Sequence, residues 1–396
     1  MENLPKAVVA GHICLDIIPD FNHLAPGQFL QLFQPGHLIL AGPAVFSTGG
    51  PVSNTGLALH KLGIPTQLIG KIGADPFGQA ILDVLRTHGG DLAEGMLVDP
   101  TCSSSYTLII NPPGVDRIFL GHLGANDTFC ADDIPCSQLE AAHLFHFGYP
   151  PVLRHFYENN GQGLVEMYRR AKATGVTTSL DMTFPDPNSP GGQADWRTIC
   201  SRAFPFVDLF LPSLEEMLFM LHRPVYERLV SQAGRADFLR LVEPELLSEV
   251  SSELLEMGAK IVLLKLGERG AYLRTAAPAE LQYMGRAAPQ DSTAWGDQEL
   301  WAPCFKVQVV GTTGSGDATI AGFLSGLLRG LTPEQALIAA VAVGACNVEA
   351  VDALGGLRTW EATMERIAAG WEQRPLSLSS PGWEWDEGNK LWRKLT

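Results

Sequence analysis

A run of small residues around a single acid, Thr312 to Phe323, has the residue types of a site that holds an anion and removes a proton. Two glycines allow the chain to turn tightly, so the backbone N–H groups of Gly314, Ser315 and Gly316 can point at one spot. Apolar residues at helical spacing follow, which predicts a helix whose positive end faces that spot. Asp317 lies in the first helical turn, where a carboxylate is suited to accept the proton of an alcohol while a phosphoryl group lies above it.

A structural interpretation fits the same residues. A Gly-Ser-Gly-Asp string before a helix is a common N-cap, in which an Asp or Ser oxygen accepts hydrogen bonds from the first helical N–H groups. In that case Asp317 stabilises the helix and takes no part in chemistry. The two interpretations differ in the partners that Asp317 should have.

A second glycine-containing stretch, Thr48 to Leu59, offers groups that suit a polar ligand. Gly49 and Gly50 allow close approach of the backbone, and a helix is expected to follow through Leu57, Leu59 and Leu62. A simple turn between two elements explains the two glycines equally well.

Asp16 is the only charged residue within residues 7–18. That stretch predicts a buried strand that ends near Gly11 and continues into an edge element. Asp16 is therefore either a turn or capping residue or a carboxylate that accepts hydrogen bonds from substrate hydroxyls.

The stretch around Asp317 resembles the C-terminal signature of the ribokinase-like (pfkB) carbohydrate kinases, Asp-Thr-x-Gly-Ala-Gly-Asp followed by Phe and an apolar, Gly-containing helix. The stretch from Thr48 is similar to the N-terminal Gly-Gly-x-x-x-Asn-x-Ala pattern of that family. Residues 67–78 resemble its Gly-x-Ile-Gly-x-Asp-x-Phe-Gly, and the resemblance extends over residues 7–360. The chain departs from the family's patterns at several positions. In the signature, Gly311 replaces the opening Asp and Ser315 replaces the Ala; elsewhere Pro51 stands where some members have Lys, and Ser213 replaces an Asn.

The resemblance implies a kinase that uses ATP and Mg²⁺ and phosphorylates a primary hydroxyl of a sugar or a nucleoside. Asp317 would be the general base, and the amides of residues 314–316 would neutralise charge that develops on the transferred group. The implied ligands of the acceptor substrate are Asp16, Gly49, Gly50, Asn54 and Asn126; those of the nucleotide are Lys265, Gly267, Gly270, Thr313 and Asn347; that of the metal is Glu216.

Several of these assignments have structural alternatives. Asn126 closes a strand, which a plain turn explains. The glycines of residues 267–270 fit a hairpin turn. Glu216 and Ser213 fit a capping box, in which each side chain bonds to the backbone of the other. Asn347 fits a buried capping amide.

The second half of the chain alternates strand-like and helix-like segments, which implies right-handed crossovers and a mostly parallel sheet with helices on both faces. Sites in such sheets lie at the C-terminal ends of strands. The resemblance completes the expectation: an α/β fold with three layers, α/β/α, over residues 1–370 and a small β-sheet lid. The lid strands are expected within 14–48 and 100–126, and residues 371–396 are expected to form a Trp-rich tail packed on the body.

Within the lid, short strands are expected at Phe29–Leu30 and at Leu38–Leu40, and a β-hairpin with its turn at residues 112–116. Apolar edges of such a small sheet need a cover, so we expect a homodimer through the lids. Residues 275–301 are expected to form a long loop, for which the sequence offers no function.

Composition excludes several classes of partner. A net charge of −15 leaves no basic surface for nucleic acid or for an anionic membrane. Seven scattered cysteines without a Cys-x-x-Cys pair predict reduced thiols, a cytoplasmic location and no zinc site. No apolar run is long enough to span a bilayer, and the first residues do not resemble a signal peptide.

Two alternatives to a sugar kinase stay open. One is a nucleoside kinase of the same family. The other is a non-catalytic protein that binds a sugar or nucleotide on the same fold, which the departures at Gly311, Pro51 and Ser213 motivate.

Overall fold

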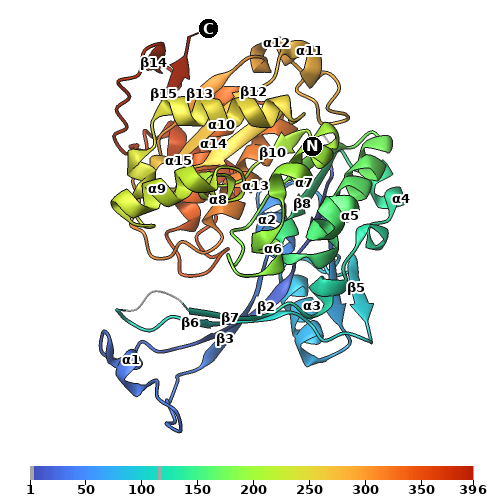
Figure 1. Cartoon of the computed structure of the whole chain (residues 1–396), viewed down its shortest axis with the longest axis vertical. Helices are drawn as coiled ribbons and strands as arrows, with labels where there is room; N and C mark the ends of the chain where they lie inside the picture. The colour runs from blue at the N-terminus through green and yellow to red at the C-terminus, as the bar shows by residue number, and fades with distance from the viewer. Residues whose placement is uncertain (1–3, 115–117, 396) are drawn as a thin grey trace.

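The large sheet is built from short strands of buried residues that alternate with helices along the chain. In the computed structural model, which describes residues 4–114 and 118–395, one sheet has the strand order β14-β15-β13-β12-β11-β10-β9-β8-β1-β4-β5 (Figure 1). Neighbours from β11 to β5 run parallel. Neighbours from β11 to β14 run antiparallel. The strands are β1 (Ala7–Gly11), β4 (Thr66–Gly73), β5 (Met96–Asp99), β8 (Leu144–Gly148), β9 (Thr177–Leu180), β10 (Leu209–Phe210), β11 (Ile261–Lys265), β12 (Ala271–Thr275), β13 (Glu299–Ala302), β14 (Trp383–Asp386) and β15 (Leu391–Lys394).

Helices cover both faces of this sheet because successive strand residues point to opposite sides. Val9 and Leu263 belong to the core on one face, whereas Val8 and Val262 belong to the core on the other. The three-layer α/β/α prediction is confirmed. The first face carries α2 (Pro51–Lys61), α3 (Pro76–His88), α13 (Ser315–Leu328), α14 (Pro333–Asn347) and α15 (Trp360–Ala368), and the second carries α4 (Cys136–Glu140), α5 (Arg154–Ala173), α7 (Trp196–Ala203), α8 (Leu214–Leu221), α9 (Arg223–Ala233) and α10 (Pro244–Glu256), with α6 (Pro190–Gln193) before α7. Among the residues described, no helix has the length and apolar character needed to cross a membrane.

The lid is a separate four-stranded sheet that projects from the body (Figure 1). Its strand order is β3-β2-β6-β7, with β3 and β7 at its edges. The bounds are β2 (Cys14–Pro19), β3 (Ala44–Gly49), β6 (Tyr106–Ile110) and β7 (Ile118–His122). β2, β6 and β7 fall within the predicted segments, β3 extends one residue past them to Gly49, and the hairpin of β6 and β7 is confirmed. Of the predicted hairpin turn, residues 115–117 lie outside the described residues.

The prediction of strands at Phe29–Leu30 and Leu38–Leu40 is wrong. The first segment belongs to a short helix, α1 (Gln28–Leu32), and the second has no regular structure. Gly27 begins this helix with a φ of 77°, which glycine adopts easily. Phe29 is buried with Phe21 and Ile110 in a small separate core. Its apolar side chain belongs to this core and does not indicate a strand.

The prediction of a long loop over residues 275–301 is wrong at its end. This segment contains α11 (Pro278–Leu281), α12 (Ser292–Trp295) and most of β13, whose residues are all buried. The strand β13 pairs with β12 on one side and with β15 of the Trp-rich tail on the other. The tail therefore extends the central sheet, and Trp383 packs against Tyr272 with ring centroids 6.2 Å apart.

Candidate active site

The turn before α13 depends on Gly314. Gly314 has a φ of 70°, and a Cβ at this position would lie 2.6 Å from the Cβ of Ala353, so only glycine fits. The helix begins at Ser315 and runs for 14 residues. Gly314, Ser315 and Gly316 line a cavity of about 510 Å³ together with Asp317, so the positive end of the helix borders a space large enough for a ligand.

Asp317 accepts hydrogen bonds from side chains of other elements. The Nδ2 of Asn54 donates to its Oδ2 (3.1 Å), and the hydroxyls of Thr55 and Tyr149 donate to its Oδ1 (3.0 and 2.7 Å). Asp317 is buried, and the N-cap position of α13 belongs to Gly314, without a side-chain cap bond. The interpretation of Asp317 as an N-cap is therefore wrong.

The glycines before α2 bring the lid and the body together beside Asp317. Gly50, with a φ of 87°, begins α2, and a Cβ there would lie 2.5 Å from the Nδ1 of His12. A Cβ on Gly49 would lie 2.5 Å from the Oδ2 of Asp16. Because Asn54 lies one turn further along α2, the structure places four of the predicted substrate ligands, residues 16, 49, 50 and 54, around one region.

Asn126 is placed differently. Its amide donates to the carbonyl of Ile13 (2.8 Å) and accepts from the N–H of Ile13 (3.3 Å), and the side chain is fully buried. Both ends of the amide are thus used by the backbone between β1 and β2. Asn126 therefore fixes the backbone at Ile13, and both polar groups of its amide already have backbone partners.

Lys265 brings a positive charge to the turn. Its Nζ donates to the Oδ1 of Asp181 (2.7 Å) and lies 3.6 Å from the place where a Cβ on Gly316 would be. Burial opposes the charge, but the carboxylates of Asp181 and Glu216 outweigh it and raise the pKa of Lys265. Burial raises the pKa of Asp181 well above its usual range and also raises that of Glu216, while Lys265 counters both shifts.

Glu216 forms the capping box that was its structural alternative. The N–H of Ser213 donates to its Oε2 (2.7 Å), and its own N–H donates to the Ser213 hydroxyl (3.2 Å). Glu216 nevertheless lines the same cavity as Asp181 and Asp317. The capping role and a role at the cavity are compatible, since the other carboxylate oxygen is not part of the box.

The remaining predicted nucleotide ligands divide into two groups. Gly267 and Gly270 line the cavity, and Thr313 lies between two residues that do. Asn347 does not line it: this fully buried side chain donates to the carbonyl of Ala353, as expected of a capping amide. Apolar residues also line the cavity, among them Phe305, Val307, Val309, Val341 and Val348.

Three residues of the site were not predicted as ligands of any kind. Thr55 follows Asn54 directly, and its small polar side chain gave no separate signal. Tyr149 and Asp181 come directly after the parallel strands β8 and β9, so their position at strand ends was the available signal. The tail also contributes: Arg374 lines the cavity and pairs with Glu268 at 2.8 Å.

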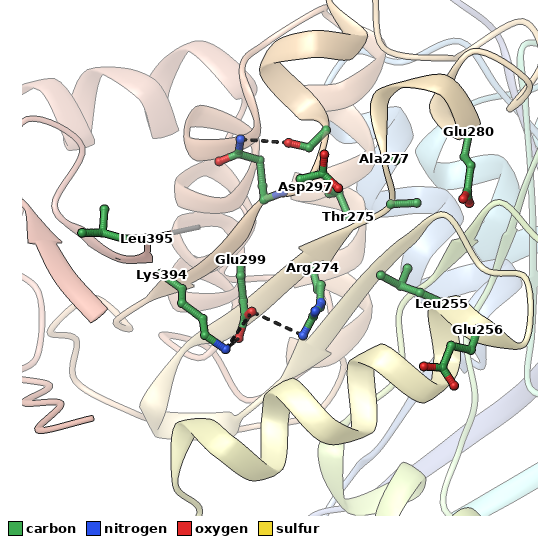
Figure 2. Close-up of a pocket in the computed structure, with 13 residues that line it drawn as sticks. Leu255, Glu256, Arg274, Thr275, Ala277, Glu280, Asp297, Glu299, Lys394 and Leu395 are labelled. Carbon is green, nitrogen blue, oxygen red and sulfur yellow. Dashed lines mark hydrogen bonds and ion pairs between the residues drawn. The ribbon is translucent and has the colours of Figure 1, made fainter. Parts of the chain in front are cut away.

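A larger cavity of about 940 Å³ lies elsewhere, beside the edge where β12, β13 and β15 meet (Figure 2). Arg274 and Lys394 both pair there with Glu299, each at 3.3 Å, as the dashed lines show. None of the predicted site residues lines it. The predicted groups for phosphoryl transfer are in the smaller cavity, which is therefore the candidate active site.

Residues 6–360 match the pfkB family carbohydrate kinases. The chain belongs to the pfkB family. Members of this family are phosphotransferases with an alcohol group as acceptor, and the match confirms the resemblance found in the sequence.

Two curated relatives and one solved structure illustrate the family. An uncharacterized sugar kinase of Archaeoglobus fulgidus is 26% identical over 282 residues, which cover 70% of this chain and 89% of the relative. A probable fructokinase-7 of Arabidopsis thaliana is 25% identical over 358 residues, covering 87% and 91%. A putative ribokinase II of E. coli, solved in complex with ATP and Mg²⁺, is 20% identical with a TM-score of 0.65 and covers 92% of this chain and 100% of that one. The last comparison shows the shared fold.

The carboxyl group of Asp16 is buried in surroundings that disfavour its charged form. Burial raises the pKa of Asp16 to about 6, and the thiol of Cys14 lies 3.4 Å from its Oδ1. A folded-state pKa above the unfolded value means that the folded protein binds this proton more tightly. The contribution to stability is therefore greatest below the unfolded pKa of 3.8 and is lost as pH rises through about 6.

We predict that Asp16→Asn stabilises the protein at pH 7.5, by roughly 1–3 kcal/mol, because the amide resembles the neutral acid. The gain should fall to about half at pH 5, where Asp16 is mostly protonated in the folded protein but still ionised in the unfolded chain, and it should approach zero only below the unfolded pKa of 3.8. Urea unfolding of both proteins at the two pH values measures this difference. An equal gain at both values would show that the charge of Asp16 is not the cause.

Proposed function

We propose that this chain transfers the γ-phosphoryl group of ATP, with Mg²⁺, to a primary hydroxyl of a sugar or sugar derivative. The observation that carries the proposal is the position of Asp317. It is a buried carboxylate in the first turn of α13, beside three consecutive amides, and it accepts hydrogen bonds from Asn54 and Thr55 of α2. ATP is supported by the cavity, which joins this turn to an apolar region suited to an adenine ring. The relative from E. coli that contains ATP supports it as well.

The transfer follows from these positions. Asp317 accepts the proton of the acceptor hydroxyl, the new bond forms between that oxygen and the γ-phosphorus, and the bond from the γ-phosphorus to ADP breaks. The amides of Gly314, Ser315 and Gly316 donate hydrogen bonds to the charge on the transferred group, and the ammonium of Lys265 lies beside them.

Unpartnered acceptors favour a polyhydroxylated substrate. Among the described residues, the buried Oδ1 of Asn54 and Nδ1 of His12 have no hydrogen-bond partner. Burial lowers the pKa of His12 to about 4, so its ring is neutral at pH 7. Unsatisfied buried polar atoms cost free energy, which sugar hydroxyls would offset by donating to them and to the carboxylate of Asp16.

Carboxylates at the cavity fit a magnesium ion. Glu216 and Asp181 line it together, and oxygen ligands are those that Mg²⁺ prefers. No group of three metal-binding side chains exists among the described residues, which suits an ion held by one or two carboxylates and the phosphates of its nucleotide. When bound, the ion would neutralise phosphate charge. Glu216 and Asp181 would hold it beside Lys265.

ATP consumption across a panel of sugars, sugar acids and nucleosides tests the proposal. We expect consumption that depends on a sugar or sugar derivative. Consumption with nucleosides alone would favour a nucleoside kinase. Binding of a sugar or nucleotide without any phosphorylated product would favour the non-catalytic alternative.

We place the enzyme in the cytoplasm. All seven cysteines are free thiols, as a reducing compartment would keep them. We assign the kinase activity to residues 1–370, with residues 371–396 as a supporting edge of the sheet. Fractionation of the native cells, with detection of the protein in the cytosol, tests the location.

Potassium should have little effect on turnover. Members of the family that a monovalent cation activates usually take ligands from the Asp that Gly311 replaces here. A Cβ on Gly311 would lie 2.7 Å from the carbonyl oxygen of Ala350 and 2.8 Å from that of Val351, so a longer side chain has no room. Initial rates in sodium and in potassium buffers of equal ionic strength should agree. A several-fold rise in potassium would contradict the prediction.

The lid should mediate a homodimer. Phe46 on β3 and Leu120 on β7 are 55% and 50% exposed on the edge strands of a sheet that needs a cover. We expect a dimer at micromolar concentration by light scattering. The double substitution Phe46→Glu and Leu120→Glu should yield a monomer. Tyr283→Glu, which alters a 77% exposed side chain outside the lid, should leave the dimer intact. A monomeric mass for the unaltered protein would contradict the prediction.

A further inference from the structure

Tyr149 is a contact of the proposed base that the reaction described above does not use. It follows β8 directly, and its hydroxyl makes the shortest of the three hydrogen bonds to Asp317, at 2.7 Å to Oδ1. The ring also lines the active-site cavity. Tyr149 and Asp317 therefore both border the space that ligands and water enter, and the phenol is bonded to Oδ1 of the base.

The hydroxyl of Tyr149 is a fixed donor. Burial raises its pKa well above the usual range, and the negative charge of Asp317 adds to this, so the hydroxyl keeps its proton. The ring stacks on His12, with centroids 6.4 Å apart and planes 26° apart. The N–H of His12 in turn donates to the carbonyl of Gly148 at 3.0 Å, which ties the two residues together.

The hydrogen bonds at Asp317 leave little room for another donor. A carboxylate has about four acceptor positions. Asn54, Thr55 and Tyr149 fill three of them, two on Oδ1 and one on Oδ2. Because Oδ1 receives two of these bonds and Oδ2 only one, an acceptor hydroxyl is directed to Oδ2.

We propose that Tyr149 is a positioning residue that closes Oδ1 of Asp317 to water, so that the base activates the acceptor hydroxyl and nothing else. The inference rests on the proposed kinase function. Without the Tyr149 hydroxyl, Oδ1 would be open to the cavity while the acceptor still occupies Oδ2. A water molecule held there lies beside the anion site: its oxygen would attack the γ-phosphorus, its proton would pass to Asp317, and the bond to ADP would break. ATP would then be hydrolysed in competition with transfer.

The test is the ratio of ADP formed to phosphorylated acceptor formed, at saturating acceptor, in Tyr149→Phe. The substitution keeps the ring and its stacking on His12 and removes the hydroxyl. We expect a ratio near one for the unaltered enzyme and a rise of several-fold in the variant. With ATP alone, the rate of ADP release should also rise several-fold, and this second measurement needs no acceptor.

Tyr168→Phe is the matched control. The hydroxyl of Tyr168 is fully buried and donates to the carbonyl of Ser179 at 2.8 Å, without a contact to Asp317. Loss of a buried phenol hydrogen bond there should leave the ratio unchanged. If Tyr149→Phe does not fold, as judged by thermal unfolding, Tyr149→Met fills the same space without a donor and should show the same rise.

The outcomes separate this inference from the proposed function. Transfer by the unaltered enzyme with an unchanged ratio in the folded Tyr149 variant would overturn the inference and leave the kinase function standing. A proportional loss of both products would also overturn it, because it would show a general loss of the site. If no acceptor is phosphorylated, the proposed function fails, and the rate with ATP alone still decides whether Tyr149 excludes water.

Discussion

Asp317→Asn should leave a folded protein whose phosphoryl transfer is reduced by roughly 10²- to 10⁴-fold, the usual effect of removing a general base. The amide has the shape of the carboxylate and lacks the proton acceptor. Its NH₂ group would meet a donor if it faced the Nδ2 of Asn54. The amide of Asn54 can turn over, however, because its Oδ1 has no partner among the described residues and can accept from the new amide. We therefore expect thermal stability close to that of the unaltered protein.

Nucleotide affinity separates loss of chemistry from loss of the site. The affinity of the Asp317 variant for ATP should be unchanged or higher, because a negative charge near the γ-phosphate is gone. Calorimetric titration with ATP measures it, and a coupled assay measures turnover. Near-normal turnover with an intact fold would refute the catalytic assignment.

An authentic capping residue supplies the control for this experiment. Asp195 is the N-cap of α7 and accepts a hydrogen bond from the N–H of Thr198 at 3.1 Å. Asn caps about as well as Asp, so Asp195→Asn should change neither stability nor turnover appreciably. Both aspartates lie at the start of a helix, but Asp195 caps its helix and Asp317 is bonded to side chains of other elements.

The sequence predicted the parts of the site that depend on local backbone geometry. Gly314 and Gly50 have positive φ angles at the beginnings of α13 and α2, and glycine at a turn before an apolar helix is a local signal. The alternation of strands and helices likewise predicted the layers of the body. The resemblance to the pfkB family then indicated that the turns before α13 and α2 belong to one site.

What the sequence could not predict depends on contacts between distant segments. Asp317 and Tyr149 are 168 residues apart, and no spacing rule relates them. The segment from 275 to 301 contains few periodic residues, so it reads as a loop, yet β13 is buried because β15 of the tail covers its free edge. Phe29 was misassigned for the same reason: its burial depends on Phe21 and Ile110.

The pair of Lys265 and Asp181 shows how a site residue and a structural residue can be told apart. Their side chains are 11% and 2% exposed and 2.7 Å apart, so removal of the lysine leaves a buried carboxylate without its partner. Breaking such a pair usually costs on the order of 3–5 kcal/mol. A loss of activity in Lys265→Met alone would therefore be ambiguous.

We expect Lys265→Met to lose stability and also to lose roughly 10²- to 10³-fold in turnover, because the ammonium lies beside the amides that receive the transferred group. Adding Asp181→Asn should restore much of the stability, since the buried charge is then neutral, and should not restore turnover. Denaturant unfolding and initial rates of the four proteins in this cycle measure the two effects separately.

Lys172→Met is the matched control, because Lys172 pairs at 2.7 Å with Asp208, a fully buried carboxylate that does not line the active-site cavity. Its loss should destabilise the protein and leave the turnover of the folded enzyme unchanged. If turnover returned with stability in the double variant of Lys265 and Asp181, the ammonium would only support the fold. Asp181→Asn alone is the reference for turnover, because it lacks the same proposed magnesium ligand as the double variant. Turnover of the double variant that stays below that of Asp181→Asn requires a positive charge at the anion site itself.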